Sequence, residues 1–208
     1  MNTGLTACKG LGQVALTTEK GVQRARLAWA ARSPDRLRLE LLAPSGHPLA
    51  ALASDGTHLY LRDHTSDRFI KHRSTNASLA PLVHVPLTVS DLIAYLLGRI
   101  PLVEADRVAL MDNLEKPGYV LNLGRWWGTV SQRILLAEDG ATVERVIRFD
   151  AEGEPAYWVK LGQHRREGGY TFVHRLSVET KKGHRIEIQL DRFWPNARID
   201  GAAFRLTP

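Results

Sequence analysis

The chain has 208 residues, of which 44% are hydrophobic, enough for a substantial core and too many for a disordered protein. No apolar run approaches the roughly 18 residues that a membrane-spanning helix needs. The net charge of +6 makes anionic partners worth considering. The basic residues are scattered, however, and neither an aromatic stacking platform nor a basic recognition helix accompanies them, so we expect no specific nucleic-acid binding.

The first third of the chain alternates apolar and polar residues with period two, which is typical of half-buried strands. Ala43 to Gly46 has the composition of a turn, and Asp55-Gly56 is a strong hairpin signal. The pattern predicts four consecutive antiparallel strands, which cover residues 22–30, 36–41, 48–54 and 57–63, after a first strand over residues 9–14.

The middle of the chain predicts an irregular stretch over residues 69–86 and then one short helix, Val89–Leu97. Thr88 and Asp91 have the spacing of a capping box, and Gly98 is a natural residue to end the helix. The helix is apolar on more than one face, because it carries Leu92, Ile93, Leu96 and Leu97. We therefore expect it to pack against the sheet or to lie over an apolar opening.

Strand patterns resume at Gly118 and continue to the C-terminal part, with Asp-Gly, Glu-Gly and Lys-Gly turns between them. The predicted strands cover residues 119–123, 129–136, 143–150, 156–164, 170–180 and 185–193. No linker, repeat or change of composition divides the chain. The sequence therefore predicts one mainly β domain, residues 1–208, built as a meandering antiparallel sheet or barrel.

The motifs of common enzymes are missing from the sequence. No histidine stands in a metal-binding motif, and we interpret His64 and His72, with Asp63 and Asp67, as a surface cluster. There is no nucleophile-elbow motif, and the glycines around residues 10–12 do not form a dinucleotide-binding loop. We expect no catalytic residue, no metal and no cofactor, although carboxylates from distant strands could still meet.

Two short segments each have two interpretations. Trp126-Trp127 can place one indole in the core and one at a rim, or it can form an aromatic wall or an interfacial lipid anchor. Cys8, the only cysteine, ends a Leu-Thr-Ala-Cys segment like a bacterial lipoprotein cleavage site, yet a strand pattern follows it at once. We interpret Cys8 as an ordinary residue that enters the first strand, and the lipidated alternative stays open.

Four segments together resemble the LolA/LolB superfamily of periplasmic lipoprotein carriers and outer-membrane lipoprotein receptors, and the LolB-like side in particular. They follow in matching order from about residue 9 to the C-terminus and cover residues 25–46, 86–98, 185–194 and 204–208. The resemblance implies a strongly curved antiparallel sheet, an incomplete barrel, with short helices lidding its concave apolar face.

The resemblance also implies a function, namely the binding of lipid or lipoprotein acyl chains in that concavity during transport to the outer membrane. Burial of methylene groups alone can hold such chains, at roughly 0.8 kcal/mol each. On this interpretation the protein is a non-enzymatic periplasmic monomer at the inner leaflet of the outer membrane, with its signal and anchor outside this chain. The residues expected to bind lipid are Leu27, Trp29, Leu37, Leu39, Leu41, Leu49, Leu59 and Leu61 on the strands, with Leu92, Ile93, Leu96 and Leu97 on the helix.

The turn at Pro44, Ser45 and Gly46 matches a membrane-facing loop in which LolB-type receptors carry a leucine. This chain has Ser45 there, so the resemblance supports lipid binding more than membrane insertion. The alternative function is a structural or scaffolding protein of the cell envelope that keeps the fold but fills its concavity with its own side chains.

Overall fold

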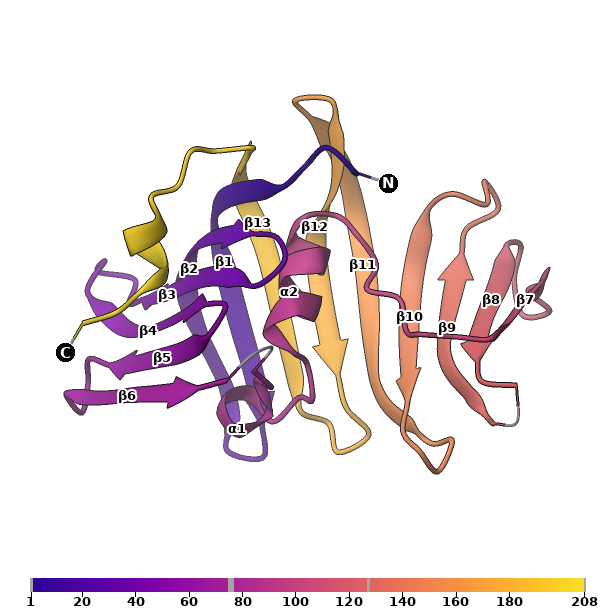
Figure 1. The fold of residues 1–208 in the computed structure, drawn as a ribbon, viewed down its shortest axis with the longest axis horizontal. Coiled ribbons are helices and arrows are strands. Elements are labelled where there is room, and N and C mark those ends of the chain that lie inside the picture. Colours follow the sequence, from indigo (N-terminus) through magenta and orange to yellow (C-terminus); the bar gives the residue numbers. More distant parts are fainter. Residues whose placement is uncertain (1, 75–76, 127, 208) are drawn as a thin grey trace.

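One antiparallel sheet dominates the computed structural model, which describes residues 2–74, 77–126 and 128–207 (Figure 1). Its 13 strands follow the order β6-β5-β4-β3-β2-β1-β13-β12-β11-β10-β9-β8-β7. The sheet is not closed, because β6 and β7 are its two edges. In chain order the strands are β1 (Ala7–Thr18), β2 (Gly21–Arg32), β3 (Arg36–Leu42), β4 (Pro48–Asp55), β5 (His58–Asp63), β6 (Arg68–Arg73), β7 (Arg107–Asp112), β8 (Tyr119–Gly124), β9 (Val130–Leu136), β10 (Val143–Phe149), β11 (Pro155–Glu167), β12 (Tyr170–Glu179) and β13 (Arg185–Pro195).

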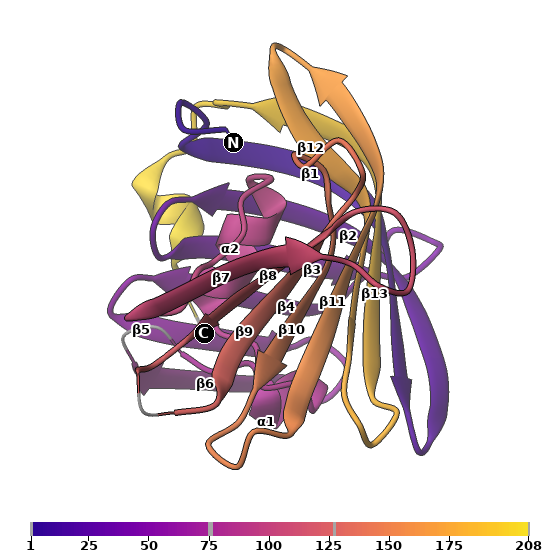
Figure 2. The ribbon, with the colours of Figure 1, turned by 90° about the vertical axis from the view of Figure 1, so that its right-hand side faces the viewer.

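The chain between the two edge strands crosses the concave side of the sheet. It forms α1 (Ala80–Val83) and α2 (Val89–Leu96), and then runs across the sheet as an extended segment to β7. Figures 1 and 2 show α2 inside the curve of the sheet, where it contacts β2, β3 and β12. The mainly β fold with short helices over the concave face, as predicted from the sequence, is confirmed.

Strand register explains why the apolar side chains collect on this face. Residues directly opposite in an antiparallel ladder share a face, and Leu27 is opposite Leu41 while Trp29 is opposite Leu39. Gly10 of β1 is opposite Trp29, and a Cβ atom there would lie 1.8 Å from the indole. The glycine therefore leaves the room that the Trp29 ring occupies against β1.

The helix signals in the sequence are confirmed, and two gaps in the prediction are corrected. Thr88 and Asp91 form the capping box of α2, and Gly98 follows the helix with a φ of +66°. The stretch predicted as irregular contains β6 and α1, and β7 forms where no strand was predicted.

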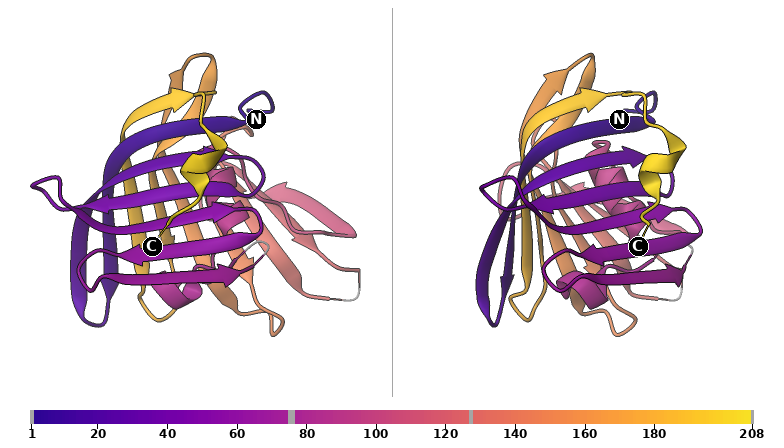
Figure 3. Two further views of the ribbon diagram at one scale, coloured as in Figure 1. Left: turned by 60° about the vertical axis from the view of Figure 1, so that its left-hand side comes forward. Right: turned by 90° about the vertical axis from the view of Figure 1, so that its left-hand side faces the viewer.

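The outer face of the sheet is covered in part by the C-terminal segment. A short 3-10 helix, η1 (Gly201–Phe204), lies over β3 and β4 (Figure 3). The Arg38 guanidinium donates to the backbone oxygen of Ala203 at 3.1 Å, and Arg205 pairs with Asp55 at 3.2 Å. These contacts hold the C-terminal segment against the outer face of β3 and β4.

Candidate functional site

The predicted lipid-contact residues lie mostly in the main core, where helix and sheet cover each other. Leu27, Trp29 and Leu37 are buried, and four more of the strand leucines are half-buried against the same core, namely Leu39, Leu41, Leu59 and Leu61. The helix residues Leu92, Ile93, Leu96 and Leu97 are at most 4% exposed. The structure thus brings the two predicted groups together, and this half of the concavity is filled by the protein's own side chains.

Leu49 does not join this cluster. It is half-buried at the register shift where Leu41 is opposite Ala50 and Leu42 is opposite Pro48. The β4 residues on the inner face are Ala50 and Leu52, opposite Leu41 and Leu39, so the alternation of β4 is shifted by one residue from the one predicted.

The other candidate residues from the sequence lie in different environments, some exposed in turns and some buried. Pro44, Ser45 and Gly46 form the exposed turn between β3 and β4, and Cys8 is buried in β1, where burial raises the pKa of its thiol to about 12. Trp126 is 74% exposed in the turn after β8, and Trp127 lies outside the described residues. His184 contacts His84, with 5.1 Å between the ring centroids.

The inner face continues as apolar rows beyond the helices toward the β7 edge. One ladder row runs across five strands and contains Leu110, Leu121, Ile134, Val146 and Val159. Ile134 and Val146 are buried, whereas Leu110 at the edge is 62% exposed. Val108, also on this face, is 61% exposed. We call β7 and β8 with their turn the wing, and it presents the uncovered part of the apolar inner face.

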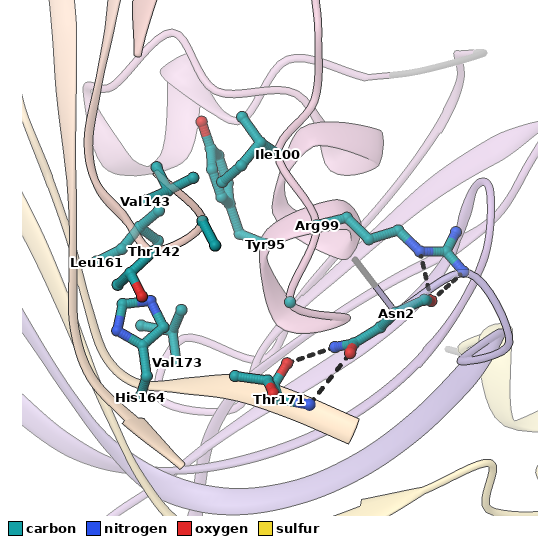
Figure 4. A pocket seen from close by; sticks show the side chains of 12 residues that line it. Asn2, Tyr95, Arg99, Ile100, Thr142, Val143, Leu161, His164, Thr171 and Val173 are labelled. Atoms are coloured by element: carbon teal, nitrogen blue, oxygen red, sulfur yellow. Dashed lines mark hydrogen bonds between the residues drawn. The ribbon is translucent and has the colours of Figure 1, made fainter. Parts of the chain in front are cut away.

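A cavity of about 330 Å³ lies between the C-terminal end of α2 and strands β10 to β12 (Figure 4). This volume is at the lower end of the range of small-molecule pockets, which is about 300–1,000 Å³. Its lining combines an apolar group with a polar group. The apolar side chains are Tyr95, Ile100, Val143, Leu161 and Val173, and the polar ones are Asn2, Arg99, Thr142, His164 and Thr171.

The polar rim of the cavity is fixed by the N-terminal residues. The Arg99 guanidinium donates to the backbone oxygens of Asn2, Thr3 and Leu5, at distances from 2.6 to 3.1 Å. The Asn2 side chain in turn hydrogen-bonds both backbone groups of Thr171 (Figure 4). Arg99 is therefore a structural clamp and is not free to bind a ligand.

Residues 99–106, which we call the strap, cross the inner face from α2 to β7. The Gln132 side chain on β9 accepts a hydrogen bond from the Val103 N–H at 3.0 Å and donates one to the Pro101 oxygen at 2.8 Å. Gln132 is completely buried, and one amide therefore holds the strap at two points. Figure 1 shows the strap passing in front of β10 and β9.

Under α2 and the strap, polar groups stand among the apolar ones. Burial raises the pKa of Tyr157 to about 12, and it raises the pKa of Tyr95 well above its usual value. Both phenols therefore stay neutral and can donate a hydrogen bond at physiological pH. Arg148 of β10 is directly opposite Tyr157 and shares the inner face with it.

The described residues contain neither a cluster of metal-binding side chains nor a membrane-spanning helix. No group of three or more His, Cys, Asp or Glu side chains there could hold a metal ion. No helix within residues 2–74, 77–126 and 128–207 is long and apolar enough to cross a membrane.

An open, strongly curved antiparallel sheet with helices on its concave side is a LolA/LolB-like fold, and the chain has that fold. A domain from Vibrio parahaemolyticus, described as an outer membrane lipoprotein-sorting protein, matches with a TM-score of 0.66 and 13% identity, covering 96% of this chain and 89% of the other. A LolA superfamily protein from Nitrosomonas europaea gives 0.62 and 10%, with 98% and 91% covered. A DUF1329 family protein from Desulfovibrio piger gives 0.69 and 11%, with 98% and 91% covered. No family model and no curated protein matches the sequence.

Proposed function

We propose that the protein binds acyl chains of a lipid or lipoprotein on its concave face, without catalysis, in lipoprotein or lipid transport to the outer membrane. The exposed apolar side chains of the wing carry this proposal. Exposed apolar patches of this kind mark interaction sites, because a soluble protein gains nothing by leaving them in water. The fold supports the same function, since two of the similar structures are named for lipoprotein sorting or for LolA.

On this proposal the protein works in the periplasm as a monomer, beside the inner leaflet of the outer membrane. Acyl chains would enter over Val108 and Leu110 and extend toward the cavity beside Tyr95. The contact set then differs from the one proposed from the sequence. The leucines on β2 to β5 would support the site from the core, and the wing would receive the ligand first.

One observation favours the scaffold alternative. The half of the concavity under α2 is packed with buried apolar side chains, as expected for a protein that has kept the fold and filled its cavity. A scaffold of this kind would bind no apolar probe, and this outcome separates the two functions.

The test compares two neighbouring residues of β7 in binding N-phenylnaphthylamine, an apolar dye that fluoresces on burial. Leu110, on the inner face, is 62% exposed, and Met111, on the outer face, is 49% exposed. Both substitutions, Leu110→Asp and Met111→Asp, should leave the melting temperature nearly unchanged, because neither side chain is buried. We expect Leu110→Asp to weaken dye binding about tenfold and Met111→Asp to have little effect.

Native mass spectrometry of the purified wild-type protein provides an independent measurement. A co-purifying ligand with the mass of an acyl-bearing lipid is the expected result. A wild-type protein that neither retains such a ligand nor binds the dye would contradict the carrier function and support the scaffold.

A further inference from the structure

Arg148 is a charged residue on an otherwise apolar or neutral row of the inner face. The row runs across five neighbouring strands and contains Val108, Leu123, Gln132, Arg148 and Tyr157. Residues directly opposite in a ladder have Cβ atoms about 4.5–5.5 Å apart, so the Arg148 side chain starts beside those of Gln132 and Tyr157. Both neighbours are buried, at 0% and 3% exposed.

The guanidinium of Arg148 forms no ion pair among the described residues. Within the described residues, no carboxylate lies within 4.0 Å of it and it makes no side-chain hydrogen bond. Arg99, the other arginine near α2, differs in this respect because three backbone oxygens occupy its donors. A half-buried cation without a partner is unfavourable, so a bound anion would stabilise it.

Two further hydrogen-bond donors stand near Arg148. The Tyr95 hydroxyl of α2 is buried and has no partner among the described residues, and the side chain lines the cavity. The Tyr157 hydroxyl, across the ladder from Arg148, makes no hydrogen bond there either. Besides burial, the charges of Asp91 and Arg148 act on the pKa of both phenols, which Asp91 raises and Arg148 lowers, so the four groups share one neighbourhood. Asp91, the acidic residue of this region, accepts the Thr88 N–H at 3.4 Å in the capping box of α2 and forms no ion pair with Arg148.

We propose that Arg148, with the hydroxyls of Tyr95 and Tyr157, binds the anionic group of an amphiphile, a phosphate or a carboxylate, whose acyl chain lies on the adjoining apolar rows. This inference rests on the proposed function and names the class of ligand, an anionic lipid. An arginine provides up to five donors and forms charge-assisted hydrogen bonds, which are about twice as strong as neutral ones. On this row and the adjoining one, the exposed apolar side chains of Val108 and Leu110 suit a hydrocarbon chain.

The test measures how single-chain amphiphiles displace bound N-phenylnaphthylamine. The competitors are decyl phosphate, decanoate, decyl glucoside and decyltrimethylammonium, each below its micelle concentration, and inorganic phosphate. For the wild type we expect the two anionic competitors to act at about tenfold lower concentration than decyl glucoside, as charge-assisted hydrogen bonds imply. Inorganic phosphate should displace nothing, because it lacks the acyl chain. Displacement by phosphate alone would contradict an amphiphile site.

Single substitutions test which side chains cause the preference for anionic competitors. Arg148→Gln should bring the displacing concentrations of the anionic and neutral competitors to within about twofold of each other, while dye binding remains. Arg145→Gln is the matched control, because Arg145 lies on the same strand, opposite Lys160 on the outer face, and should keep the wild-type preference. Tyr95→Phe should reduce the anion preference without lowering the melting temperature, because it removes a hydroxyl that has no partner.

The outcomes separate this inference from the proposed function. A wild-type protein that binds the dye but does not prefer anionic competitors overturns the anion site alone. A preference that survives in both Arg148→Gln and Tyr95→Phe, or that is lost equally in Arg145→Gln, also overturns it. Absence of dye binding in the wild type overturns the carrier function itself.

Discussion

Asp55, where β4 ends, illustrates how a single residue joins separate parts of the fold. Its carboxylate accepts hydrogen bonds from the backbone N–H groups of Thr57 and His58 at 3.0 and 2.8 Å, and from the Tyr60 hydroxyl at 2.9 Å. It also pairs with Arg205 of the C-terminal segment. Burial by itself would raise the pKa of Asp55, but these hydrogen bonds together hold the pKa well below its usual value of 3.8.

This depressed pKa predicts a loss of stability in acid. Because the folded-state pKa lies below the unfolded-state value, the stabilisation is present above about pH 4 and is lost as the pH falls below it. We expect Asp55→Asn to lower the free energy of unfolding by about 1–3 kcal/mol at pH 7 and to flatten its decline in acid. Urea unfolding between pH 7 and pH 2 measures both effects.

Asp67→Asn is the control for that experiment. Asp67 lies in the turn between β5 and β6, where it forms an ion pair with Arg62 and its side chain is 87% exposed. Removal of the Asp67 charge should therefore leave the pH dependence of stability unchanged. An Asp55→Asn variant with the wild-type acid profile would show that the hydrogen bonds around Asp55 do not stabilise the folded state.

At the scale of single elements, α2 acts as core. Its capping box, its glycine stop and its apolar faces agree with one another, and for this reason the sequence was sufficient to place it. Its apolar side chains are buried, and it contacts strands on two distant parts of the sheet. The Val89–Leu97 helix predicted as a lid therefore covers the concave face as a packed element, and the strap is the thinner cover over β9 and β10.

We expect Leu96→Asp to destabilise the protein by several kcal/mol, because it places an unpaired charge in the core. Ala94→Asp is the matched control, since Ala94 is only half-buried on the same helix and should change stability far less. Thermal unfolding measured together with dye binding tests this expectation. A Leu96→Asp variant that melts near the wild-type temperature but binds no dye would instead identify α2 as a movable lid.

The two strands that the sequence did not predict are the edges of the sheet. β6 carries mostly exposed basic side chains, and β7 exposes Val108, Leu110 and Met111 on both faces. An edge strand has a neighbour on one side only, so burial does not impose the apolar–polar alternation that reveals a strand in sequence. Interior strands such as β2 and β3 alternate clearly, and the register of β2 to β5 places seven of the eight strand residues on one face.

At the scale of the whole molecule, the open sheet gives the concavity two different halves. The half under α1 and α2 is filled, and the half toward β7 is covered by the strap and ends in the exposed wing. Sequence patterns identified the apolar face but not which part of it is uncovered. That depends on where residues far apart in the chain come together, as Gln132 does with Pro101 and Val103.

The turn between β3 and β4 is the part of the molecule that we expect to meet a membrane. Ser45 is exposed at the turn between β3 and β4, so Ser45→Leu should touch no core residue and leave the melting temperature nearly unchanged. If this turn faces the membrane, insertion of a leucine side chain should contribute about 1.5–3 kcal/mol, and binding to anionic vesicles should increase about tenfold or more.

Ala151→Leu, in the exposed turn between β10 and β11, is the control, because it adds a leucine at a different rim position without a change in charge. Vesicle flotation of the three proteins measures the difference. An increase confined to Ser45→Leu would support a membrane-facing turn whose insertion residue is missing in this chain. Equal increases in both variants would show only that exposed leucines bind lipid, and unchanged binding in Ser45→Leu would show that this turn does not reach the bilayer.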